Sequence, residues 1–102
     1  MCGIIGILSN CNINIFDFLM MSLLQLQNRG YDSSGICMLD NNEYILHKYA
    51  STKEIDSVEK LKSMNFSNEN VNLGIGHNRW ATHGPKNDIN AHPHISNNGK
   101  II

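Results

Sequence analysis

The pattern of apolar and polar positions predicts short strands around one long helix. Gly3–Leu8 is an unbroken apolar run rich in isoleucine, which is typical of a buried strand. Ile15–Leu26 is also mostly apolar, and its length favours a helix that runs to about Asn28. Asn14 can cap the start of this helix, and Gly30 can end it. Because apolar residues occur around most of its circumference, we expect the helix to be covered on more than one side.

The rest of the pattern predicts a hairpin, a second helix and one more strand. Val58, Leu61 and Met64 recur at helical spacing, which indicates a short amphipathic helix over Asp56–Met64. Asn41-Asn42 is suited to the tight turn of the hairpin. We find no repeat or linker, so residues 1–102 form one unit. The other expected segments are strands Ser34–Leu39, Glu43–Tyr49 and Leu73–Trp80, polar loops Ser9–Asn14 and Asn65–Asn70, an irregular stretch Ala81–His94, a turn Ser96–Gly99 and the opening of another strand at Lys100–Ile102.

Composition and charge exclude several classes of function. Of the 102 residues, 41% are hydrophobic and 17% are charged, as in globular domains. The net charge of -1 provides no basic surface for nucleic acid or for a membrane. Asp17, Ser22 and Gln25 interrupt the longest apolar stretch, so we predict no membrane span. Three cysteines without a C-x-x-C pair fit a reducing, cytoplasmic compartment.

Cys2 is the first candidate for catalysis. Removal of Met1 would leave Cys2 with both a thiol and a free α-amine. A thiol has a pKa of about 8.5 and an α-amine one of about 8, so the amine can take the thiol proton near neutral pH. One residue could then supply both nucleophile and general base. The alternative is that position 2 is an ordinary, poorly ordered terminal residue.

Arg79 and the residues after it are the second candidate. An arginine at a strand end offers a planar, two-pronged donor for a small carboxylate, and the Thr82 hydroxyl can add to it. Trp80 can exclude water from such a site. The alternative is that Arg79 pairs with a carboxylate elsewhere and Trp80 belongs to the core.

The five histidines raise the question of a metal site. His77, His83, His92 and His94 lack the i, i+4 spacing of a helical zinc site, and no C-x-x-C pair supplies thiolates. Pro93, between His92 and His94, favours a turn. We therefore predict no metal and no cofactor.

Four motifs together resemble a known family. They are MCGIIG from Met1, RGYDSSG from Arg29, HNRWATHG from His77 and NAHPH from Asn90. In this order they resemble the class II glutamine amidotransferases, and most closely the glutamine–fructose-6-phosphate aminotransferases. Tyr31 and Trp80 distinguish this branch from amidophosphoribosyltransferases and asparagine synthetases. The resemblance implies an α+β fold, a partial Ntn-hydrolase-type four-layer αββα sandwich with antiparallel sheets.

The resemblance also implies roles for individual residues. Cys2 matches the nucleophile that attacks the side-chain amide of glutamine and forms a γ-glutamyl thioester. The other matching residues are Arg79, which grips the glutamine α-carboxylate, Thr82 and His83 beside it, Trp80 in the loop that closes over the site, His92 in the pocket wall, and Arg29 and Gly30 in a turn that supports the nucleophile.

The same resemblance indicates what residues 1–102 lack. They correspond to the N-terminal part of a type-2 glutamine amidotransferase domain, without the sugar-phosphate isomerase domain. The family's oxyanion Asn-Gly pair would follow Ile102, and Asn98-Gly99 is better explained as a turn. The implied function is glutamine amide hydrolysis that supplies ammonia for amination of fructose 6-phosphate. The alternative is a truncated, non-catalytic homologue. The expected partners are glutamine and a chain or domain that completes the fold.

Overall fold

The computed structural model describes residues 1–11, 13–66 and 71–102. Its four strands form one sheet in the order β1-β4-β2-β3, and every neighbouring pair is antiparallel. The expected α+β class and antiparallel pairing are therefore confirmed. The elements are β1 (Gly3–Leu8), α1 (Ile15–Gln25), the 3-10 turn η1 (Gln27–Arg29), β2 (Ser33–Asp40), β3 (Glu43–Ala50), α2 (Ser57–Lys62) and β4 (Leu73–Arg79).

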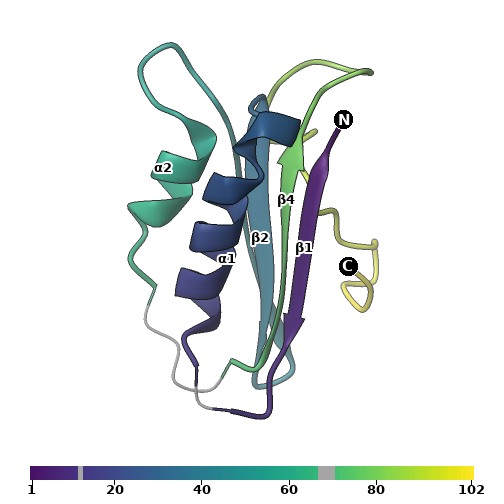
Figure 1. Cartoon of the computed structure of the whole chain (residues 1–102). Helices are drawn as coiled ribbons and strands as arrows, with labels where there is room; N and C mark the ends of the chain where they lie inside the picture. The colour runs from purple at the N-terminus through teal and green to yellow at the C-terminus, as the bar shows by residue number, and fades with distance from the viewer. Residues whose placement is uncertain (12, 67–70) are drawn as a thin grey trace.

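Both helices cover the same face of the sheet (Figure 1). Ile15, Leu19 and Leu23 of α1 are fully buried against the strands. Gly74 and Gly76 of β4 lie directly beneath this helix, and a Cβ atom at Gly74 would be 2.9 Å from Ile15 Cγ2. The glycines thus allow α1 to lie close to the sheet. In the described residues this gives one sheet and one helical layer, which is half of a four-layer sandwich.

The long helix packs against the sheet and against α2, but not around its whole circumference. Phe16 and Met20 are buried with the core, but Met21 is 64% exposed and Leu24 is 42% exposed. The sheet and α2 both pack against α1, as the prediction of cover on more than one side requires, while the outer surface with Met21 and Leu24 stays open. Neither this helix nor any other in the described ranges is long and apolar enough to cross a bilayer.

Both helices are shorter than predicted, although their caps are as expected. The Asn14 side chain accepts a hydrogen bond from the Asp17 N–H, which fixes the start of α1. This helix ends at Gln25 rather than near Asn28, because the chain tightens into η1. The second helix covers Ser57–Lys62, not Asp56–Met64, because Asp56 is its N-cap and Met64 follows in a turn.

The strands agree with their predicted bounds to within one residue, but the chain end does not. Asn41 and Asn42 both have positive φ in the hairpin turn, and Gly99 has φ +67 in the turn after Ser96. Residues 100–102 form no strand; the Lys100 carbonyl instead accepts a hydrogen bond from Tyr44 Oη at 3.1 Å. Part of the predicted loop at 65–70, and Asn12 in the earlier loop, lie outside the described residues.

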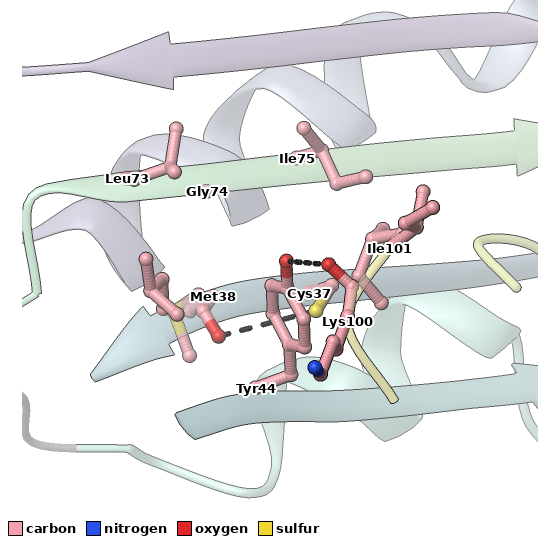
Figure 2. A pocket seen from close by; sticks show the side chains of 10 residues that line it. Cys37, Met38, Tyr44, Leu73, Gly74, Ile75, Lys100 and Ile101 are labelled. Atoms are coloured by element: carbon pink, nitrogen blue, oxygen red, sulfur yellow. Dashed lines mark hydrogen bonds between the residues drawn. The ribbon is translucent and has the colours of Figure 1, made fainter. Parts of the chain in front are cut away.

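The face of the sheet opposite the helices carries an apolar hollow of about 290 Å³. Figure 2 shows Tyr44, Ile75 and Ile101 around it, with the Tyr44–Lys100 hydrogen bond across one side. Cys37 lies in its floor, and burial raises the pKa of this thiol to about 11. Cys37 therefore stays protonated near neutral pH and is a poor nucleophile.

Candidate active site

Strand pairing brings Cys2 to the end of β4. Gly3 pairs with Asn78, so the next residue outward from β1 lies beside Arg79 and Trp80. The Trp80 backbone N–H donates to Cys2 Sγ at 3.5 Å, and Sγ is 3.9 Å from the Trp80 carbonyl oxygen. Two residues 78 positions apart in the sequence thus share one site.

A pocket of about 490 Å³ opens at this point. It contains all six residues that the sequence marked as catalytic or substrate-binding, and four that it did not. The former are Cys2, Arg79, Trp80, Thr82, His83 and His92; the latter are Gly84, Pro85, Asn90 and His94. Asn98 and Gly99 are not among the lining residues, and the Asn98 side chain accepts hydrogen bonds from Ser96 and Lys100 within its own turn.

Arg79 is the buried cation of the pocket, at 8% exposure. Its Nη1 donates to the Pro85 carbonyl at 3.2 Å, and its Nη2 donates to the His83 carbonyl. These contacts shape the loop into a turn in which Gly84 has φ +74. A guanidinium has five N–H donors. A carboxylate ligand would supply a negative charge and further acceptors.

Arg29 and Gly30 contact the two halves of the site from η1. Arg29 Nε donates to the Cys2 carbonyl at 3.3 Å. A Cβ atom at Gly30 would be 2.6 Å from the Arg79 carbonyl carbon, so only glycine allows this approach. Gly30 follows the end of the helical backbone as predicted, but its φ of 178 is extended. Glycine is therefore needed at position 30 because the Arg79 backbone packs so closely, and not because the backbone is left-handed.

Sequence analysis did not identify Asp32 as a site residue. Its side chain holds the loop that follows Trp80 at Ala81 and Lys86. Its Oδ2 accepts from the Ala81 N–H at 2.7 Å, and its Oδ1 pairs with Lys86 Nζ at 2.5 Å. Burial alone would raise the pKa of the Asp32 carboxyl, but Lys86, the Ala81 N–H and the Arg79 charge together hold it below its usual range. The RGYDSSG motif contained this residue, but only the fold brings it opposite Ala81.

The segment before His92 is fastened to the edge strand β3. The Ala50 N–H donates to Asp88 Oδ1 at 2.7 Å, and Lys48 Nζ donates to the carbonyls of Ile89 at 3.0 Å and Ala91 at 2.8 Å. These bonds bring the NAHPH segment back across the sheet to the pocket.

Three histidine rings are stacked edge to face at the pocket wall. The ring centroids of His77 and His92 are 4.5 Å apart, and those of His92 and His94 are 4.7 Å apart. Burial, followed by the charges on His92, Arg79 and His94, lowers the pKa of His77 to about 4. Burial also lowers the pKa of His92 and of His94. In the described part of the chain, no group of three or more His, Cys, Asp or Glu side chains could hold a metal ion.

Gly35 provides a test of this packing, because a Cβ there would be 2.1 Å from the His92 carbonyl oxygen and 2.6 Å from Lys48 Cβ. We expect Gly35→Ala to lower the free energy of unfolding by about 1–3 kcal/mol and to displace His92. Gly6→Ala is the matched control, since its Cβ would be an ordinary 3.8 Å from Ile75. Urea unfolding of both variants is the measurement. Equal stabilities would show that His92 does not pack against β2 as described.

The chain is similar to known proteins over nearly its whole length. No family model matches the chain. It is 42% identical over 104 residues to the glutamine–fructose-6-phosphate aminotransferase of Wigglesworthia glossinidia brevipalpis, a match covering 100% of this chain and 16% of that protein. It is 45% identical to the enzyme of the same name from Sulfolobus acidocaldarius, covering 99% of this chain and 17% of that protein, and 44% identical to that of Pyrococcus horikoshii, covering 100% and 16%. The chain thus spans about a sixth of the length of these curated relatives, and over its own length it is related to the glutamine–fructose-6-phosphate aminotransferases.

Proposed function

We propose that residues 1–102 are the N-terminal part of a type-2 glutamine amidotransferase domain in which Cys2 is the nucleophile. The observation that carries this proposal is the meeting of Cys2 and Arg79 in one pocket. A sulfur nucleophile and a buried guanidinium that line one cavity fit a substrate with an electrophilic carbon and a carboxylate. Glutamine has both. The names of the relatives support the same substrate and add fructose 6-phosphate as the acceptor of its ammonia.

The proposed chemistry follows from these two groups. Arg79, with Thr82 and His83 beside it, holds the α-carboxylate. After Met1 is removed, the Cys2 α-amine takes the thiol proton and the thiolate attacks the side-chain amide carbon. The carbon–nitrogen bond breaks, ammonia leaves with the proton, and a γ-glutamyl thioester remains. Water then hydrolyses the thioester and releases glutamate.

The supporting residues position Cys2 and Arg79 and do not take part in the reaction directly. Arg29 fixes the Cys2 carbonyl, and Gly30 allows η1 to approach Arg79. Trp80 is 43% exposed and packs edge-on against Tyr31, with ring centroids 5.5 Å apart. In this position it can cover a bound ligand at the pocket mouth.

Glutamate and ammonia release from glutamine tests the proposal, with intact mass measured on the same sample. We expect release only from protein that has lost Met1, because only that form has a free amine on Cys2. Asparagine, one methylene shorter, is the matched substrate control and should react far more slowly. Undiminished activity with Met1 retained would contradict the role of the amine. Glutamine binding without release would favour the non-catalytic alternative.

A further inference from the structure

His92 and His94 both contact polar groups that project from the sheet. His92 Nδ1 is 3.2 Å from His77 Nε2, and His94 Nδ1 is 3.3 Å from Lys48 Nζ. In a neutral imidazole one ring nitrogen carries a proton and the other is an acceptor. The position of each proton therefore depends on which partner donates in each contact.

Lys48 determines which atom is the donor in the contact with His94. Its ammonium group has three N–H donors and no acceptor. Burial lowers the pKa of Lys48, but two of its donors meet the carbonyl oxygens of Ile89 and Ala91, and these acceptors favour the charged ammonium. The third N–H then donates to His94 Nδ1. Because that nitrogen accepts, a neutral His94 carries its proton on Nε2.

His77 Nδ1, the ring nitrogen outside the contact, indicates which residue is the donor between His77 and His92. His77 Nδ1 is buried, and within the described residues it has no hydrogen-bond partner. If His92 were the donor, a neutral His77 would carry its own proton on this nitrogen, as a buried N–H without an acceptor. Buried N–H groups of that kind are rarer in proteins than unpaired acceptors. The favoured arrangement places the proton on His77 Nε2, which donates to His92 Nδ1.

We propose that His77 and Lys48 are positioning residues that hold His92 and His94 as neutral tautomers with the proton on Nε2. The Nε2 atom lies across the ring from Nδ1, so both N–H groups are directed away from the sheet contacts. Both histidines line the pocket. The wall formed by these two rings is therefore a hydrogen-bond donor, suited to a carbonyl or carboxylate oxygen of the ligand.

This arrangement also limits which group can act as base. The Nδ1 lone pairs of His92 and His94 are occupied, and their Nε2 atoms already carry protons. Neither ring can take the Cys2 thiol proton without losing its bond to the sheet. This consequence rests on the proposed function, and it leaves the Cys2 amine as the base.

Long-range proton–nitrogen correlation spectra of the ¹⁵N-labelled protein near pH 7 test the assignment, because they distinguish the two neutral tautomers of each histidine. We expect His92 and His94 each to show only the Nε2–H pattern. His47 of β3, which does not line this pocket, is the internal reference for the spectra. A dominant Nδ1–H pattern for His92 or His94 in the wild-type protein would overturn the proposal, whether or not any variant folds.

Two variants separate the two contacts. His77→Leu should convert only His92 to a mixture of tautomers, and Lys48→Met should do so for His94. His77→Gln keeps an N–H donor at similar reach and should restore the Nε2–H pattern. Unchanged tautomers in both deletion variants would contradict the assigned donors.

Glutamine kinetics provide an independent readout. We expect His77→Leu to lower kcat/KM about tenfold, the value of one hydrogen bond, and His77→Gln to recover most of it. The tautomer spectra do not require turnover. Correct tautomers in a protein that does not hydrolyse glutamine would refute the proposed function and leave this inference intact.

Discussion

Replacement of Cys2 by alanine is expected to reduce glutamine hydrolysis by about 10⁴-fold or more, to the assay background. The loss is this large because no thioester can form without the sulfur. Alanine is small, so Met1 should still be removed and the α-amine should remain. The variant therefore separates the role of the thiol from that of the amine. Glutamate release and mass spectrometry of the acyl-enzyme are the measurements.

The chain supplies its own controls for this substitution. Cys11 is exposed and is not among the pocket residues, so Cys11→Ala should leave the rate unchanged. Cys37 is buried beneath the opposite hollow, and its raised pKa keeps it protonated. A Cys2→Ala protein that retained wild-type turnover would exclude the thioester mechanism. Loss of activity in Cys11→Ala would show that the assay reports a general loss of fold.

The strands were predictable from local sequence, because their apolar runs end at polar or glycine-containing turns. Asn41-Asn42 marks the hairpin for the same local reason. The end of α1 was not predictable in this way. Residues 27–29 are compatible with a helix, but the side-chain contacts of Gln27 with Asp56 and of Arg29 with Cys2 accompany a tighter turn. The end of this helix thus coincides with contacts between residues distant in sequence.

In the pocket too, single residues were predictable from local motifs, but their contacts with residues distant in sequence were not. Motifs identified Cys2 and Arg79 separately, but their meeting depends on the pairing of Gly3 with Asn78. Asp32 reaches the Ala81 N–H because β2 pairs with β4, which no spacing rule indicates. The contact of Lys48 with His94 requires the chain to return across β3. No pattern in a single sequence predicts that this segment crosses back over β3.

Replacement of Arg79 by lysine is expected to raise the KM for glutamine about 100-fold while kcat changes much less. Lysine keeps the charge but loses the two-pronged geometry and the two carbonyl contacts with His83 and Pro85. A loss of one or two charged hydrogen bonds to the α-carboxylate corresponds to about 3 kcal/mol. Steady-state kinetics of wild type and variant provide the measurement. A change confined to KM is the signature of lost ground-state binding.

A glutamine analogue whose α-carboxylate is replaced by a neutral amide tests whether Arg79 binds the substrate or only shapes the loop. The wild-type protein should discriminate strongly against this analogue, because its amide cannot pair with the buried Arg79 charge. Arg79→Met, which removes the charge, should lose most of that discrimination, since the two substrates would then be held about equally weakly. If Arg79 only shapes the loop from residue 83 to residue 85, the variant would bind both substrates less well by the same factor. Equal discrimination in the two proteins would therefore remove Arg79 from the substrate and leave it a structural role.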